Sequence, residues 1–215
     1  MKETSPVVEG LLMIHRIITR GLNTSIQQCE KYIDNKGIPG QEMEGYSKYL
    51  ATLKWVMHAH HTTEDELGFP YFKDHIEAPY DQLKKDHFTL ALLLEKIEPS
   101  PSALHDGGIM NLREVLVEIN NLWTPHINIE QEKFSSENVN SFISMKEQIK
   151  LAKEFGEHSG KNAGPGPLAL PFMFYDLEKE DREEFLKSFP WILKSFLVPV
   201  VWKRQWKPMI PYLLL

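Results

Sequence analysis

The stretches HHTTE (residues 60–64) and HINIE (residues 126–130) repeat one pattern, a histidine followed four residues later by a glutamate. Four residues are about one turn of an α-helix, so both side chains of each pair project from one helical face. That face is otherwise apolar, with Leu53, Val56 and Leu67 beside the first pair and Ile119, Leu122 and Trp123 beside the second. Imidazoles and carboxylates are costly to bury unless they are paired or bind a metal. Two such pairs on two helices therefore predict a dinuclear metal site inside a helical bundle.

Four of the nine histidines fall on such apolar seams, one in each of four segments with helical periodicity. These histidines are His15, His60, His87 and His126. A single histidine on an apolar face is usually a core residue with a hydrogen-bond partner. Four of them, two followed one turn later by Glu64 and Glu130, are hard to explain by chance. These six side chains therefore favour metal binding over a purely structural role.

The other five histidines are expected outside the metal site. His61 directly follows His60 and projects about 100° away from it on a helix, so we expect it at the surface or behind the ligands. His58 is expected on the flank of the same helix. The remaining three fall in segments predicted to be solvated loops: His75, His105 and His158.

Long segments of helical periodicity alternate with turn-rich stretches along the first part of the chain. Helices are expected over residues 6–34, 41–67, 80–97, 109–134 and 136–155. The second should end near Pro70, because proline discourages continuation of a helix, and Pro125 should bend the fourth just before His126. Short loops between long helices predict an all-α fold, an up-down four-helix bundle with additional C-terminal helices.

The C-terminal part of the chain differs in composition from the bundle. Residues 156–167 are rich in glycine and proline and predict a linker. Asp176 is expected to cap a helix that continues to about Leu197. We therefore predict two parts, a metal-binding helical bundle over residues 1–155 and a linker with a helical extension that packs on the bundle over residues 156–215.

The aromatic segment 189–206 permits two hypotheses. Its tryptophans and the nearby basic residues are typical of a segment at a membrane surface. However, its longest apolar run covers only residues 196–202 and contains Pro199, so it is too short to span a membrane. We therefore favour a cover over apolar surface of the bundle, with binding to a membrane surface as the alternative.

The bulk composition is that of an ordinary globular protein. Apolar residues make up 42% of the chain and charged residues 25%, which is enough for a sizeable core. The net charge of −6, without a Lys/Arg stripe, argues against a nucleic-acid-binding protein. Cys29 is the only cysteine, so no disulfide framework is expected and a reducing compartment, the cytoplasm, fits. Neither a signal peptide nor a transmembrane segment is expected.

The order and spacing of these motifs resemble those of the hemerythrin-like proteins, which contain the HHE cation-binding domain. The matching pieces are His15, HHTTEDELGFP (residues 60–70), DHFTL (residues 86–90) and HINIEQEKF (residues 126–134). The resemblance extends over about residues 1–155. The segment from Leu168 onward is similar to the C-terminal extension of fungal-type members.

This resemblance implies a non-haem di-iron centre with six protein ligands. By the resemblance, one iron is bound by His15 and His60, the other by His87 and His126, and both are bridged by Glu64 and Glu130. Imidazole and carboxylate ligands suit iron, and also manganese or zinc.

The third predicted helix departs from the pattern of the oxygen-carrying members. Those members have a second histidine one turn from the first, whereas this chain has Leu83 and Ala91 at that spacing from His87. The resemblance therefore implies one nitrogen ligand fewer and open coordination positions. Open positions favour external ligands or activation of O2 over simple oxygen transport.

Two functions of different classes fit the sequence. The first is a di-iron protein that binds O2, NO, peroxide or a similar small ligand, or that senses iron or redox state; it needs the six ligands and an apolar pocket. The alternative is a di-iron oxidase or peroxidase that acts at an open coordination position, which also needs a route for substrate and protons. A purely structural bundle is disfavoured because its buried polar pairs would be uncompensated.

Overall fold

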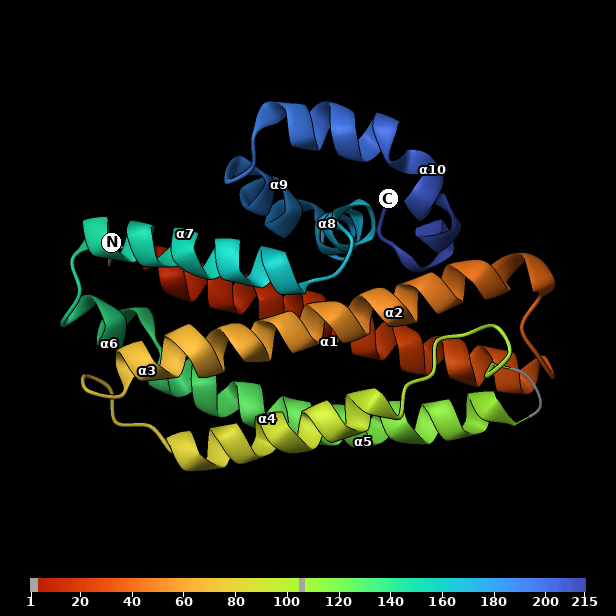
Figure 1. The fold of residues 1–215 in the computed structure, drawn as a ribbon, viewed down its shortest axis with the longest axis horizontal. Helices are drawn as coiled ribbons and strands as arrows, with labels where there is room; N and C mark the ends of the chain where they lie inside the picture. Colours follow the sequence, from red (N-terminus) through yellow and green to blue (C-terminus); the bar gives the residue numbers. More distant parts are fainter. Residues whose placement is uncertain (1–3, 105–106) are drawn as a thin grey trace.

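The computed structural model describes residues 4–104 and 107–215, and its centre is a bundle of four long helices (Figure 1). These are α1 (Pro6–Asp34), α2 (Gly40–Thr63), α4 (Tyr80–Glu95) and α5 (Gly108–Lys133). Helix α1 packs against α5 and α2, and α4 packs against the same two helices, which closes the bundle. The predicted all-α fold, an up-down four-helix bundle with additional C-terminal helices, is confirmed.

The bundle helices begin and end close to their predicted positions. Ser5 accepts at its Oγ atom a hydrogen bond from the backbone N–H of Val8 (3.3 Å), and Pro6 takes the first helical position, where its missing N–H is not needed. Helix α5 contains Pro125 one residue before His126, and the bend expected there stays a prediction. These boundaries keep the seam histidines well inside their helices.

Two apolar clusters fill the bundle, one on each side of a polar layer. The smaller cluster includes Val8 near the start of α1 and Phe134 at the end of α5. The larger cluster includes Ile18, Leu53 and Trp123. Between them the helices contain buried histidines and glutamates. Because the clusters exclude water from this layer, its polar groups need partners inside the protein.

The helix that begins as α2 passes Pro70 and ends two residues later, close to the predicted end. After Thr63 it continues as a π-helix, η1 (Glu64–Gly68), and then as α3 (Phe69–Phe72), with Pro70 inside the helical path. In η1 the backbone N–H of Phe69 donates to a carbonyl five residues back. Pro70 does not stop the helix at once because the wider π-turn relieves the clash that a proline ring makes in a regular α-helix.

The predicted fifth helix is divided into α6 (Ser136–Asn140) and α7 (Met145–Asn162). Ser144 and Glu147 start α7 with a capping box, in which each side chain accepts a hydrogen bond from the other residue's backbone N–H. Helix α7 packs against α1 and α2 and continues to Asn162, so the linker predicted at 156–167 is mostly helical. Packing outweighs the helix-weakening effect of its glycines, about 1 kcal/mol each. The division of the chain near residue 156 stays a prediction.

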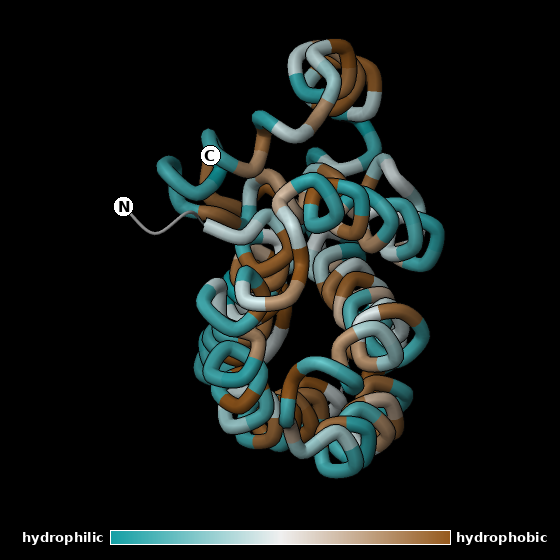
Figure 2. The backbone as a smooth tube through the Cα atoms, turned by 90° about the vertical axis from the view of Figure 1, so that its left-hand side faces the viewer, coloured by the Kyte–Doolittle hydropathy of each residue, from teal (hydrophilic) through white to brown (hydrophobic). Residues whose placement is uncertain are grey.

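The C-terminal segment is a series of short helices over one side of the bundle (Figures 1 and 2). It contains α8 (Gly166–Tyr175), α9 (Lys179–Lys187), the π-helix η2 (Leu193–Val201), α10 (Lys203–Trp206) and the 3₁₀-helix η3 (Lys207–Tyr212). Helices α8 and η3 pack against α2. A Cβ atom at Gly45 of α2 would lie 1.9 Å from the carbonyl oxygen of Pro208, so this close approach requires glycine. Within residues 4–104 and 107–215, no helix combines the length and apolar content that a membrane crossing needs.

A buried ion pair joins the C-terminal segment to the bundle. Asp176 does not begin a helix as predicted; it follows the last residue of α8 and is buried. Its carboxylate accepts hydrogen bonds from the guanidinium of Arg20 and from the hydroxyl of Tyr49 (2.8 Å). Arg20 also donates to the backbone carbonyl of Tyr212 (3.1 Å). Because these donors satisfy the buried carboxylate, Asp176 serves the packing of the segment and not a helix start.

Replacement of Asp176 by asparagine is expected to destabilise the protein by about 3 kcal/mol, because Arg20 loses its buried partner. The free energy of unfolding from urea titration measures this loss. The matched control is Asp181→Asn, which removes the partner of the exposed Arg16 side chain (2.7 Å) and should cost less than about 1 kcal/mol. Equal losses in both variants would contradict a stabilising role for the buried pair.

Candidate metal centre

The bundle brings the four seam histidines and two glutamates into one layer. The layer contains His15 from α1, His60 from α2, Glu64 from η1, His87 from α4, and His126 and Glu130 from α5. All six side chains are buried. The residues that the sequence singled out as ligands are therefore neighbours in space, although they come from every helix of the bundle.

The carboxylate of Glu130 lies between two histidines of different helices. Its Oε2 atom is 3.2 Å from Nε2 of His15, and its Oε1 atom is 3.3 Å from Nε2 of His126. The two carboxylate oxygens of Glu130 thus lie toward opposite sides of the layer, each beside one histidine, as a bridging group would require.

The carboxylate of Glu64 also lies between two histidines. Its Oε2 atom is 3.3 Å from Nε2 of His60 and 3.5 Å from Nε2 of His87. Two ligand atoms that each lie about 2.1 Å from one ion, at right angles, are about 3 Å apart. The spacings in this layer therefore fit ligands that share an ion.

Two overlapping groups of ligand atoms result from this arrangement. The first group is His15, His60, Glu64 and Glu130, and the second is Glu64, His87, His126 and Glu130. Within each group the ligand atoms lie within 4.8 Å of one another. Because the glutamates belong to both groups, two ions held here would be neighbours with two shared carboxylates.

Six buried ligand atoms in this layer form no hydrogen bond of good geometry with any described residue, although imidazole and carboxylate atoms approach one another to 3.2–3.3 Å. They are Nε2 of His15, His60 and His61, Oε2 of Glu64, and both carboxylate oxygens of Glu130. An unsatisfied buried polar atom costs about 1–3 kcal/mol, and more when it is charged. A positive ion in the layer would compensate these atoms together, so the residues present fit a bound metal.

The outer nitrogens of two histidines are held by carboxylates. Nδ1 of His87 donates to Asp65 (3.0 Å), and Nδ1 of His126 donates to Asp86 (3.4 Å). Because a carboxylate accepts, Nδ1 carries the proton and Nε2 keeps its lone pair for the centre of the layer. This role of the two aspartates was not predicted from the sequence. The available signal was their position, since Asp65 follows Glu64 and Asp86 precedes His87.

Burial shifts the pKa values of the layer. It lowers the pKa of His60 and of His61 well below the usual range, and neighbouring histidines lower both further, so the rings are neutral as metal ligands must be. Burial raises the pKa of Glu64 well above its usual range, and the nearby Glu130 carboxylate adds to this. Burial acts on Glu130 in the same direction, but adjacent imidazoles, His126 foremost, outweigh it and hold its pKa well below the usual range.

His61 belongs to the same layer, which corrects the expectation of a position at the surface or behind the ligands. Its side chain is only 5% exposed, and its ring centroid lies 4.3 Å from that of His87 and 5.9 Å from that of His126. His60 instead faces His15, at 5.0 Å. Positions 100° apart can both be buried because α2 has neighbours on several sides. His61, His87 and His126 form a third group of candidate ligands.

The remaining histidines lie in other parts of the chain. His58 is exposed on α2 and His75 is exposed after α3, as predicted. His158 was predicted in a loop but lies on α7, half-buried, with Nδ1 2.9 Å from the hydroxyl of Thr63. This position follows from the unexpected length of α7. His105 lies outside the described residues.

The hemerythrin HHE cation-binding domain, a known protein family, matches residues 7–136 of this chain. The chain belongs to the hemerythrin family. The matched range contains every residue of the buried layer, and the predicted resemblance is confirmed. Neither the curated proteins nor the solved structures include a significant match to the chain.

Aromatic side chains of the two apolar clusters border the layer of this hemerythrin domain on both sides. The ring of Trp123 lies 5.4 Å from that of His15, and its indole N–H donates to the hydroxyl of Thr19 (2.9 Å). Phe69, from the opposite cluster, stacks on His87 with centroids 5.3 Å apart. These contacts fix the imidazole rings and exclude water from both sides.

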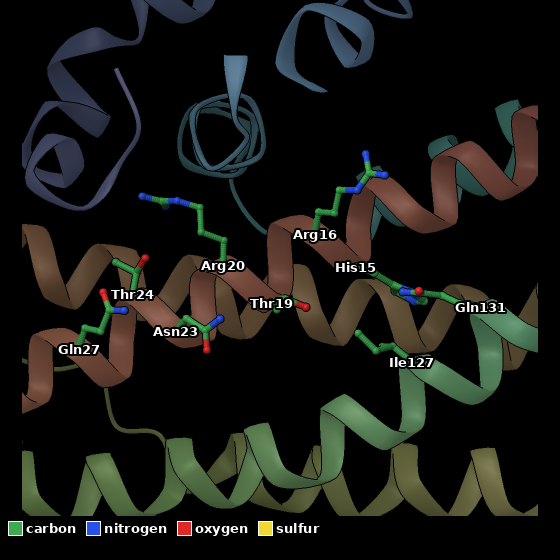
Figure 3. Close-up of a pocket in the computed structure, with 9 residues that line it drawn as sticks. All are labelled: His15, Arg16, Thr19, Arg20, Asn23, Thr24, Gln27, Ile127 and Gln131. Carbon is green, nitrogen blue, oxygen red and sulfur yellow. The ribbon is translucent and has the colours of Figure 1, made fainter. Parts of the chain in front are cut away.

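A polar pocket of about 470 Å³ borders the hemerythrin layer at His15 (Figure 3). Its lining consists of His15, Arg16, Thr19, Arg20, Asn23, Thr24, Gln27, Ile127 and Gln131. The side-chain amide of Gln131 lies 3.2 Å from Nδ1 of His15, while Arg16 and Arg20 extend from α1 toward the C-terminal segment (Figure 3). The sequence did not predict this pocket, because its walls come from α1 and α5.

Metal removal with a chelator is expected to lower the melting temperature of the hemerythrin domain, because the buried ligand atoms lose their compensating charge. A metal present at about 100 times its dissociation constant adds roughly 2.7 kcal/mol, which corresponds to about 5–10 °C for a chain of this size. Differential scanning calorimetry of the metal-loaded and chelated forms measures the difference. The Glu64→Ala/Glu130→Ala variant serves as control and should not respond to metal. Equal melting temperatures for the two wild-type forms would contradict metal binding in the layer.

Proposed function

We propose that this protein holds two iron ions in the buried layer and uses them to bind a small ligand such as O2, NO or peroxide, or to sense iron or redox state. The observation that supports this most strongly is the set of six buried, unpartnered ligand atoms around the two shared glutamates. Imidazole nitrogens with carboxylate oxygens suit iron, and also manganese or zinc. Bound there, iron would supply a redox-active centre that accepts external ligands.

The proposed ligands of the first ion are His15 and His60, those of the second ion are His87 and His126, and the bridges are Glu64 and Glu130. We add His61 to the second ion, since its Nε2 atom is buried without a partner and its ring lies against those of His87 and His126. His61 would supply from α2 the nitrogen that oxygen-carrying members supply from a second histidine on the third helix.

The proposed ligand set is unequal between the two ions. With the shared carboxylates, the first ion has two histidines and the second has three, so a six-coordinate metal keeps more open positions beside His15. The pocket borders the layer on this same side, at His15 and Gln131. This coincidence supports access of an external ligand to the first ion. Its lining combines polar side chains with apolar surface, including that of Ile127.

The iron content of natively purified protein tests the proposal. We expect two iron ions per chain in the wild type and none in the Glu64→Ala/Glu130→Ala variant. In His61→Ala we expect the affinity for the second ion to be about 10–100-fold lower than in the wild type. The matched control is His58→Ala, an exposed histidine on the same helix, which should keep both ions.

Two results would contradict parts of this proposal. Protein without metal, or a double glutamate variant that keeps both ions, would rule out a di-iron centre in this layer. Unchanged iron affinity in His61→Ala would remove His61 from the ligand set and leave the other six residues in place.

A di-iron oxidase or peroxidase is the alternative function, and the size of the pocket favours it. A water molecule takes about 30 Å³ of liquid volume, and small-molecule sites occupy about 300–1,000 Å³. The volume of about 470 Å³ beside His15 therefore exceeds the need of a diatomic ligand. The hydroxyl and amide groups of its lining would suit a polar organic substrate, while Arg16 and Arg20 are already paired with Asp181 and Asp176.

Consumption of O2 or hydrogen peroxide by the iron-loaded protein separates the two functions. We expect a stable spectral adduct and no more than about one equivalent consumed for each di-iron centre, because the described residues of the layer offer no free acid or base beside the pocket. Continued consumption over many turnovers would favour the enzyme. The chelated protein provides the baseline.

The cytoplasm is the proposed compartment, on the basis of the single cysteine. Cys29 is buried, and burial raises the pKa of its thiol to about 11 although the hydroxyl of Tyr46 acts in the opposite direction. The thiol is therefore protonated at neutral pH and poorly reactive. A chain with one such cysteine forms no intrachain disulfide, so an oxidising compartment would not stabilise it in that way.

A further inference from the structure

The outer face of η2, together with the two residues that precede it, exposes several large apolar side chains. This apolar ridge consists of Trp191, Ile192, Phe196, Val200 and Val201, and each member is between 47% and 71% exposed. Figure 1 shows η2 on the side of the C-terminal segment that faces away from the bundle, and Figure 2 shows apolar residues in this outermost helix. Isolated exposed apolar residues are ordinary, but a contiguous row of this kind marks an interaction surface.

The ridge is a consequence of π-helical geometry. In η2 the backbone N–H of Trp202 donates to the carbonyl of Leu197, five residues back. The widened turn puts residues four or five apart on one face, which matches the spacing of Ile192, Phe196 and Val201. The opposite face is fixed to the protein, because Val198 is buried and its carbonyl accepts a hydrogen bond from the indole N–H of Trp206 (2.8 Å). The ridge is therefore presented by a firmly packed element.

Basic residues follow the ridge in the sequence. Residues 185–215 contain five basic residues and no acidic ones, whereas residues 1–184 contain 19 basic and 30 acidic residues. Lys203, Arg204 and Lys207 directly follow η2, and their exposed side chains form no ion pair with any residue that the structure describes. The chain is acidic overall, so this concentration of unpaired positive charge beside exposed apolar groups is local to one surface.

We propose that the apolar ridge docks on the surface of an anionic lipid bilayer. Trp191 and Phe196 would enter the boundary between headgroups and acyl chains, where aromatic rings are favoured. Lys203, Arg204 and Lys207 would contact the acidic headgroups. A second copy of the chain fits less well, because a symmetric contact between two ridges would bring like charges together. The segment was expected from the sequence to cover the bundle; α8 and η3 have that role, and the outer face of η2 is free to bind a membrane surface.

Sedimentation of the full-length, metal-loaded protein with lipid vesicles tests the proposal. We expect binding to phosphatidylcholine vesicles that contain about 30% phosphatidylserine and little binding to phosphatidylcholine alone. Binding should weaken in about 0.5 M salt, because salt screens the headgroup charge. The absence of binding to the acidic vesicles would overturn the proposal.

Two variants and one matched control make the test specific to the ridge. Trp191→Ser/Phe196→Ser should weaken vesicle binding at least about tenfold, and Lys203→Gln/Arg204→Gln should weaken it about fivefold for each charge removed. The control is Phe88→Ser/Leu92→Ser on α4, which removes two side chains that are 66% and 53% exposed and that belong to a different helix from Lys203, Arg204 and Lys207. It should bind as the wild type does. Circular dichroism checks that each variant keeps its helices.

Three other outcomes would overturn the proposal. Full binding by the ridge variant would show that charge alone attracts the protein to vesicles. Equal losses in the ridge variant and the α4 control would show unspecific adhesion of apolar residues. A ridge variant that changes the protein from a dimer to a monomer by light scattering, with vesicle binding unchanged, would assign the ridge to contact with a second copy.

Discussion

The removal of imidazole and carboxylate groups from water is the constraint on which the rest of this structure depends. Seven such side chains meet between two apolar clusters. Each helix of the bundle contributes at least one of them, so the helices must pack in an arrangement that brings these side chains into contact. The same cost explains the outer carboxylates of Asp65 and Asp86, which hold the imidazoles in one orientation. It also explains Trp123 and Phe69, which close the layer on opposite sides. The apolar clusters and the polar layer are thus parts of one arrangement.

Much of this arrangement could be predicted because it follows from the periodicity of individual helices. A histidine and a glutamate four residues apart share a face whatever the helix packs against, so His60 and Glu64 identify their seam without knowledge of the fold. The position of His61 could not be predicted from helical periodicity alone. Whether a position 100° from the seam is buried depends on which neighbours flank the helix, and α4 and α7 flank α2 here only because of distant parts of the chain.

The incorrect predictions have a common physical origin, since tertiary contacts outweighed local preference in each case. The glycines of α7 stay helical because that helix packs on α1 and α2. Asp176 is a residue type that often caps helices, yet its carboxylate accepts hydrogen bonds from Arg20 and Tyr49 at the interface between the bundle and the C-terminal segment. A side chain that suits several roles takes the one that its neighbours in the folded structure allow.

The π-helix η1 makes this part of the polar layer tolerant of a change in chain length. A π-turn contains one residue more than the α-helical turn that it replaces. Loss of one residue between Glu64 and Gly68 would restore regular α-helical bonding, and Phe69 would keep its place against His87. Loss of one residue from the regular turns of α2 before His60 would instead rotate the earlier part of that helix by about 100° relative to the histidines. Among related genes, insertions and deletions of one codon are therefore better tolerated in η1 than in α2.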